Sequence, residues 1–75
     1  MRGVAMRVSY KKLWKLLIDK DMNKSDLRRM TGISTVTIAR MTRGEDVTLT
    51  ILTRICQALD CDICDVVELE RIQAS

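Results

Sequence analysis

The sequence predicts an all-α fold, a compact bundle of five helices that forms one domain over residues 1–75. Apolar residues recur with the 3.6-residue period of a helix along most of the chain. The chain also has no proline and only three glycines, and its 75 residues leave room for one small core. Because there is no phenylalanine and only one tryptophan and one tyrosine, we expect an aliphatic, methionine-rich core. Residues 1–8 precede the first periodic segment, and we expect them to form a flexible or extended arm.

The first two helices are expected over residues 9–20 and from Asn23 to Gly32. In the first helix, one stripe holds Leu13, Leu16 and Leu17, with Trp14 beside it. In the second, Asn23 is the expected N-cap, and Asp26 follows three residues later in a capping-box arrangement. This helix is expected to bury Leu27 and Met30.

The third helix is expected over residues 35–43, within the stretch GISTVTIARMTRG. Ser34 is placed to cap its first turn, and Gly44 follows where a left-handed cap favours a residue without Cβ. At about 100° per residue, Ile38 and Met41 fall on one face. The opposite face carries Thr35, Val36, Ala39, Arg40 and Arg43. No acidic residue occurs from residue 27 to 44, so this outer face is suited to an anionic partner.

The fourth and fifth helices are expected in the last third of the chain. In TLTILTRICQALD, Thr48 is the expected N-cap, and the core positions are Leu52, Ile55, Cys56 and Leu59. The fifth helix is expected to follow Asp62, with Ile63, Val66 and Val67 facing inward. Leu69 and Ile72 would then remain exposed on its outer side.

Charge is distributed unevenly along the chain. Residues 1–44 contain 11 Lys and Arg against 3 Asp and Glu, whereas residues 45–75 contain 2 against 7. A folded basic segment is typical of a protein that binds nucleic acid, although a solvated helix surface has the same composition. Charge alone leaves both interpretations open.

The second and third helices are joined by the short turn TGIS, which is the sequence form of a helix-turn-helix. In this motif the second of the two helices can lie in the DNA major groove. Arg pairs with guanine, and Thr and Val methyl groups contact the thymine methyl, so the outer face of residues 35–43 is chemically suited to base edges.

The stretch DLRRMTGISTVTIARMTRGEDVTLTILTRICQALDCDICDVV resembles phage repressor and Cro-type (XRE-like) helix-turn-helix domains. The resemblance covers roughly residues 9–70, and SYKKLWKLLIDKDMNK is also similar to small regulators of glycopeptide-resistance operons. It implies a five-helix domain of the lambda-repressor-like type that binds double-stranded DNA and regulates transcription. It further implies a homodimer on a two-fold operator. Since one small domain offers little to recruit polymerase, a repressor is the expected role.

The resemblance also implies which residues contact DNA. Base contacts fall on Thr35, Val36, Thr37 and Arg40, and phosphate contacts fall on Asn23, Lys24, Ser34 and Arg43. Helix N-termini offer free N–H groups to phosphate, which suits the positions of Lys24 and Ser34.

The chain departs from the family pattern at several positions. Arg28 stands where many relatives have alanine, so its stem must turn outward. A buried Arg–Glu pair of the wider family corresponds here to Leu17 and Thr42. Glu45 and Asp46 follow the reading helix, and they would repel the DNA backbone unless they point away.

Three cysteines, Cys56, Cys61 and Cys64, occur near the C-terminus. The sequence CDIC has the spacing of a dithiol redox pair or of half a zinc site, but the chain has no histidine to complete one. We interpret the thiols as structural and expect no metal and no cofactor. A thiol-based redox-sensing regulator acting through Cys61 and Cys64 is the alternative.

Other functional classes are less well supported. Without histidine, a Gly-rich phosphate loop or a paired-carboxylate cleft, the chain lacks the groups of an enzyme. No apolar run reaches the roughly 20 residues of a membrane span, so we expect a cytoplasmic protein. A protein-interaction module, such as an antirepressor or antitoxin with the same fold, remains an alternative because Leu69 and Ile72 are expected to be exposed.

Overall fold

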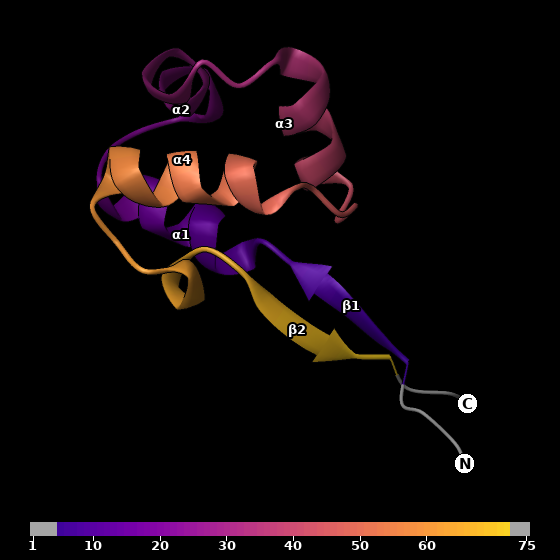
Figure 1. Ribbon diagram of the computed structural model, residues 1–75. Helices are drawn as coiled ribbons and strands as arrows, with labels where there is room; N and C mark the ends of the chain where they lie inside the picture. Colours follow the sequence, from indigo (N-terminus) through magenta and orange to yellow (C-terminus); the bar gives the residue numbers. More distant parts are fainter. Residues whose placement is uncertain (1–4, 73–75) are drawn as a thin grey trace.

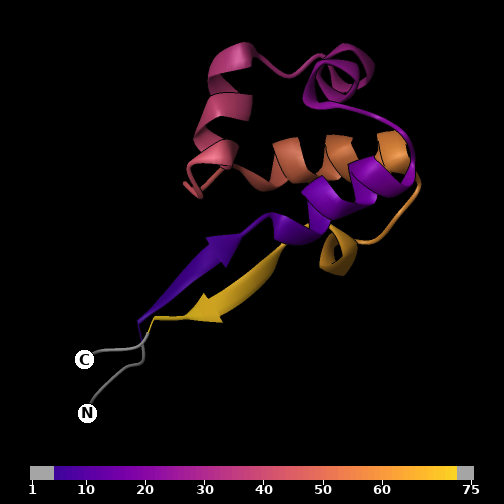
Figure 2. The same ribbon diagram turned by 180° about the vertical axis from the view of Figure 1, so that it is seen from behind.

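Four α-helices and a two-stranded ribbon make up the part of the chain, residues 5–72, that the computed structural model describes (Figure 1). The elements in order are β1 (Met6–Ser9), α1 (Lys11–Asp19), α2 (Lys24–Thr31), α3 (Thr35–Thr42), α4 (Leu49–Leu59), the 3-10 turn η1 (Ile63–Asp65) and β2 (Glu68–Arg71). Helices α1 and α4 lie in the middle, with α2 and α3 on one side and the ribbon projecting from the other (Figures 1 and 2). The molecule is therefore elongated, with extents of 43 × 23 × 19 Å.

The helix ends follow the sequence prediction closely. Asn23 and Asp26 form the reciprocal capping box at the start of α2, with N···O distances of 2.8 and 3.0 Å. The Ser34 and Thr48 hydroxyls each accept a backbone N–H three residues later, at 3.2 and 3.3 Å. Gly32 ends α2 with a φ of 71°, a conformation that disfavours residues with Cβ. These caps fix the boundaries of the helix-turn-helix.

The core is aliphatic, as the composition predicts. Predicted core residues that are buried are Leu13, Leu17, Leu27, Ile38, Met41, Leu52, Ile55, Leu59 and Val66. Leu16, Cys56 and Val67 are only half-buried. Tyr10 and Ile33 are buried without having been predicted. Their side chains close the core at the start of α1 and in the turn between α2 and α3.

The prediction that Met30 and Ile63 belong to the core is wrong, because both side chains are exposed. Helix α2 has only eight residues and fully buries Leu27 alone, so a side chain on the edge of its apolar stripe stays outside the core. Ile63 lies in a single 3-10 turn, which is too short to present an inward stripe.

The prediction of a fifth helix is also wrong. A capping box between Asp62 and Asp65 does form, but it encloses only the three residues of η1. Two β-branched valines follow, and such residues favour strands over helices. The next four residues pair with β1 as β2, and this pairing satisfies their backbone groups instead of a further helical turn.

The ribbon is antiparallel, and its register divides the side chains into two faces. Met6 pairs with Arg71 and Val8 with Leu69, so these four share one face; Arg7, Ser9, Glu68 and Glu70 share the other. Residues 6–8 fall in the segment expected to form an arm, and Ser9 was expected to begin the first helix; here all four residues form β1, and α1 begins at Lys11. Residues 1–4 of that arm lie outside the described residues.

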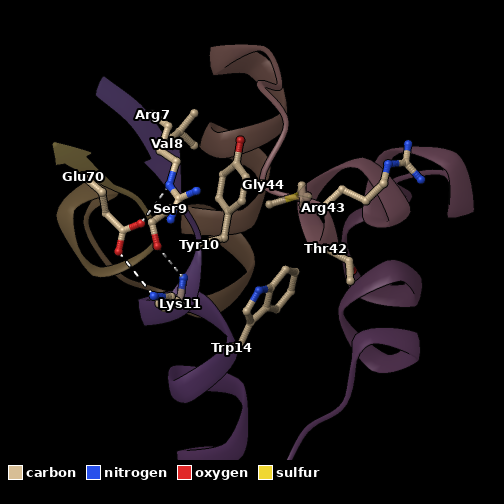
Figure 3. Close-up of a pocket in the computed structure, with 11 residues that line it drawn as sticks. Arg7, Val8, Ser9, Tyr10, Lys11, Trp14, Thr42, Arg43, Gly44 and Glu70 are labelled. Atoms are coloured by element: carbon tan, nitrogen blue, oxygen red, sulfur yellow. Dashed lines mark hydrogen bonds and ion pairs between the residues drawn. The ribbon is translucent and has the colours of Figure 1, made fainter. Parts of the chain in front are cut away.

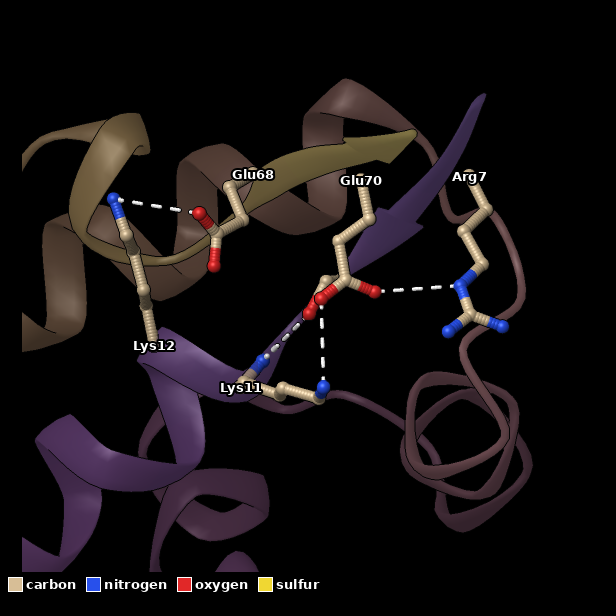
Figure 4. Close-up of polar contacts among 6 residues, drawn as sticks. Arg7, Lys11, Lys12, Glu68 and Glu70 are labelled. Atoms are coloured by element: carbon tan, nitrogen blue, oxygen red, sulfur yellow. Dashed lines mark hydrogen bonds and ion pairs between the residues drawn. The ribbon is translucent and has the colours of Figure 1, made fainter. Parts of the chain in front are cut away.

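On the polar face of the ribbon, two glutamates of β2 form ion pairs with cations of β1 and α1 (Figure 4). Glu70 accepts from Arg7 Nε at 3.3 Å and from Lys11 Nζ at 3.4 Å, and Glu68 lies 4.0 Å from Lys12 Nζ. Desolvation of Glu70 opposes its ionisation, but the two cations outweigh this effect and lower its pKa. These contacts join the basic start of the chain to its acidic end.

Candidate nucleic-acid interface

Helix α3 presents the outer face that the sequence predicts. Thr35, Val36 and Arg40 are exposed, whereas Thr37 is half-buried. The opposite face is anchored because Ile38 and Met41 are buried in the core. The exposed side chains therefore project from a helix whose opposite face is packed in the core.

The N-terminus of α3 combines a side-chain cap with free backbone donors. Ser34 Oγ accepts the Thr37 N–H and lies 3.0 Å from Thr37 Oγ1, so both hydroxyls take part in the cap. Among the described residues, the N–H groups of Thr35 and Val36 have no acceptor. Because free N–H groups carry the positive end of the helix dipole, this terminus is suited to a phosphate.

Asn23 and Lys24, at the start of α2, are both engaged within the protein. Asn23 belongs to the capping box described above. The Lys24 ammonium lies 4.4 Å from the centroid of the Trp14 ring and donates to Thr42 Oγ1 at 2.9 Å. Lys24 therefore links α1, α2 and α3, and this link includes Thr42, one of the positions where the family's buried ion pair is missing.

The cations around the motif divide into paired and unpaired ones. Arg43 Nε donates to Glu45 at 2.6 Å, and Arg29 pairs with Asp26. The hydrogen bond from Arg43, followed by the charges of Arg43 and Arg40, lowers the pKa of Glu45 against a smaller opposing effect of desolvation. Within residues 5–72, Arg28 and Arg40 have no ion pair, and both are exposed. These two arginines therefore form no ion pair, although the charge of Arg40 acts on Glu45.

Glu45 and Asp46 behave differently in the loop after α3. Glu45 is turned to Arg43, which neutralises it. Asp46 lines an open hollow of about 330 Å³ beside α3, together with Thr37, Arg40, Val47, Thr48 and Ile51. Thus one of the two acids that would repel DNA is compensated, and the other lies beside Arg40.

Tyr10 and Trp14 support the interface and were not singled out from the sequence as part of it. The Tyr10 hydroxyl donates to the Glu45 carbonyl at 2.7 Å, which attaches the loop after α3 to the start of α1. Both rings line a hollow of about 220 Å³ between β1, α1 and the end of α3, and Arg43 points away from them (Figure 3). The available signal was their spacing of four residues, which places the chain's two aromatic side chains on one helical face.

A family model of the Cro/C1-type HTH DNA-binding domain matches residues 12–71. The chain belongs to this family. The matched Cro/C1-type region contains all eight residues that we expect to contact DNA, from Asn23 to Arg43. It also contains the helix caps that define the helix-turn-helix.

A solved structure of the transcriptional regulator VanUg is similar to this Cro/C1-type domain over its whole fold. The two chains are 47% identical, the match covers 96% of each, and the TM-score is 0.89. The resemblance to regulators of the glycopeptide-resistance type is thereby confirmed. Among curated proteins, none matches significantly. No helix within residues 5–72 is long and apolar enough to cross a membrane.

Proposed function

We propose that this chain is a sequence-specific transcriptional regulator that reads the DNA major groove with α3. The observation that carries the proposal is the exposed face of Thr35, Val36 and Arg40 on a helix whose other face is buried. The methyl groups of Thr35 and Val36 suit thymine, and the Arg40 guanidinium suits guanine. The similarity to a transcriptional regulator at 47% identity supports the same role.

The proposed phosphate contacts use donors that the internal bonds leave available. An ammonium has three N–H donors, and Lys24 directs one of them to Thr42. A guanidinium has five, and Arg43 directs its Nε to Glu45. At Ser34 the side chain is occupied, so a phosphate there would be bound by the adjacent free N–H groups of α3. The Asn23 side chain is also occupied, by the capping box, so Asn23 would contribute by fixing the start of α2.

We further propose a homodimer on a two-fold operator, acting as a repressor. Occupation of the operator by a folded domain excludes other proteins from the same DNA, which is sufficient for repression. The apolar face of the ribbon supplies a surface for the second copy, because Met6 and Leu69 are exposed there. An isologous contact of this kind places equivalent residues on both subunits.

Selection of bound sequences from a random DNA pool, followed by a salt titration on the selected site, tests the proposal. With four or five contacts to phosphate or base, log affinity should fall against log salt with a slope of about −4 per monomer. Failure to select any sequence, or a nearly flat slope, would contradict DNA binding and favour an interaction module for protein partners.

Two matched variants make the titration specific to the interface. Arg43→Ala should reduce the slope by about 1, because one cationic contact is lost. Arg54→Ala, which removes an exposed arginine from α4 outside the proposed interface, should leave the slope unchanged. Equal effects of the two variants would mean that the salt dependence reflects overall charge and not this surface.

A further inference from the structure

The C-terminal end of α4 brings two cysteines together. Asp60 ends the helix in the left-handed conformation, with φ 53° and ψ 55°. The N–H of Cys61 then donates to the carbonyl of Cys56 at 3.0 Å, which closes the six-residue ring of a Schellman-type helix end. In this motif the side chains of the two bonded residues commonly contact each other. The backbone therefore places the thiols of Cys56 and Cys61 on one side of the helix end.

Both thiols are accessible to small reagents. Cys56 and Cys61 are half-buried free cysteines, and both line an open hollow of about 390 Å³ with Gln57, Asp60 and Ile63. Burial and, after it, the neighbouring Cys56 raise the pKa of the Cys61 thiol to about 11. Cys56 is thus close enough to Cys61 to affect the ionisation of the Cys61 thiol.

Cys64 belongs to a different group. It is exposed in η1, and its sulfur lies within 4.8 Å of carboxylate oxygens of Asp62 and Asp65. The same hollow that Cys56 and Cys61 line does not include Cys64. Cys64 is therefore the cysteine nearest to Cys61 in the sequence, whereas Cys56 is the cysteine that the helix end places beside it.

We propose that Cys56 and Cys61 form an oxidisable dithiol, a modification site that low-molecular-weight disulfides such as oxidised glutathione convert to an intramolecular disulfide. The site is independent of the proposed DNA-binding role. It replaces the Cys61–Cys64 pair as the redox-active pair of the chain.

The reaction proceeds by two thiol–disulfide exchanges. The Cys56 thiolate attacks one sulfur of oxidised glutathione, which forms a mixed disulfide and releases one glutathione thiolate. The Cys61 thiolate then attacks the Cys56 sulfur, which forms the protein disulfide and releases the second glutathione. Two protein thiols are oxidised, one glutathione disulfide is reduced, and the two thiol protons end on the two released glutathione molecules.

The raised pKa of Cys61 determines how the rate depends on pH. The thiolate is the nucleophile, so the second exchange should accelerate as pH rises from neutral toward 11. A mixed disulfide at Cys56 removes the contribution of Cys56 to the raised pKa of Cys61 and leaves that of burial.

The disulfide would lie far from the proposed reading helix. Cys56 and Cys61 are at the C-terminal end of α4, and α3 precedes the N-terminal end (Figures 1 and 2). Eleven helical residues separate these ends by roughly 16 Å. Oxidation should therefore stabilise the connection between α4 and β2 and leave DNA affinity unchanged.

Peptide mapping by mass spectrometry after incubation of the folded, full-length chain with oxidised glutathione tests this assignment. The parent chain and Cys64→Ser should both lose two hydrogens and yield a linked Cys56–Cys61 peptide. Cys56→Ser and Cys61→Ser should yield only mixed disulfides with glutathione. If the parent chain links Cys61 to Cys64, or forms no internal disulfide, the proposal is overturned.

Thermal unfolding of the same samples gives a second measurement. Closing the ring should raise the melting temperature of Cys64→Ser by about 5 °C or more, and reduction should reverse the rise. If Cys56→Ser fails to fold, Cys56→Ala provides an apolar replacement for the same mapping. A linked peptide without any rise in melting temperature would contradict the stabilising role of the disulfide.

Discussion

At the scale of single residues, Arg40 is the position at which base reading can be tested most directly. Arg40→Ala should lower affinity for the selected site by roughly 1–3 kcal/mol and relax the preference at one base pair, because a bidentate guanine contact is lost. Arg40 is exposed and has no ion pair within the described residues, so the melting temperature should change little. Binding to a set of single-base operator variants measures both effects. If the change weakened binding to every sequence equally, base reading by α3 would be contradicted.

Lys24 should behave differently, and the structure changes what we expect of it. As a phosphate contact, Lys24→Ala should weaken binding to all sequences alike. The same change also removes the contact with Trp14 and the hydrogen bond to Thr42, so it should lower stability by about 1 kcal/mol. Thermal unfolding and the operator profile of one variant separate the two roles. An unchanged melting temperature would mean that the link between the three helices contributes no stability.

The residue pattern predicted the orientation of α3 well and that of α2 less well. Ile38 and Met41 are buried, and Thr35 lies outside, because a 3.6-residue period fixes which side chains share a face. The period does not fix how much of a face its neighbours cover, and Met30 is exposed for this reason. The link from Lys24 to Trp14 could not be predicted, because it depends on how α1 meets α2.

At the scale of elements, the sequence predicted the four helices and the N-caps of α2, α3 and α4, and it missed the ribbon. Caps are local hydrogen bonds between residues three apart, as at Asn23 and Asp26, so the sequence alone contains them. Strand β2 depends on β1, which lies more than 50 residues away, and its short alternating segment is equally compatible with a helical turn. The capping box at Asp62 and Asp65 is typical of a helix start. The helical segment nevertheless ends after three residues, because the following residues pair with β1.

Tyr10 connects two of these elements, and its removal should be measurable. Tyr10→Phe leaves the Glu45 carbonyl without its 2.7 Å donor, which should cost about 0.5–1.5 kcal/mol of unfolding free energy. Burial, followed by the charge of Asp46, raises the pKa of Tyr10 in the folded chain. The stability that this shift provides is complete below pH 10 and is lost as pH rises through the higher folded pKa.

Denaturant unfolding at several pH values measures both effects of the Tyr10 change. The parent chain should lose stability above pH 10 more steeply than Tyr10→Phe does, since only the parent chain has this hydroxyl to ionise. Parallel curves for the two chains would show that Tyr10 ionises equally in the folded and unfolded states.

At the scale of the whole molecule, the basic and acidic halves of the chain form different parts of the fold. The basic half forms α1, α2 and α3, and the acidic half returns along η1 and β2 to pair with the start of the chain. The ion pairs of Glu68 and Glu70 therefore neutralise cations at the ribbon and leave those around α3 available to DNA. This arrangement also leaves the two faces of the ribbon unequal, since the ion pairs lie on one face only.

The apolar face of the ribbon makes the proposed dimer testable with a matched pair of variants. Leu69 is 65% exposed on the face that it shares with Met6 and Val8. Ile72 is 47% exposed, and its N–H donates to the Ala5 carbonyl, which continues the ribbon by one pair. Because side chains alternate along a strand, Ile72 shares the opposite face with Glu70. The two residues, expected on one side of a helix, therefore lie on different faces of the ribbon.

Leu69→Lys should weaken cooperative binding to a two-half-site operator about tenfold, because a free-energy loss near 1.4 kcal/mol is reasonable for one leucine contact. Ile72→Lys adds the same charge on the other face and should leave cooperativity unchanged. Both variants should bind a single half-site as the parent chain does, since strand β2 lies apart from α3 (Figure 1). Titrations on operators with one and two half-sites, one helical turn apart, measure the difference. Equal loss in the two variants would point to an effect of charge, and non-cooperative binding by the parent chain would rule out a dimer contact through this face.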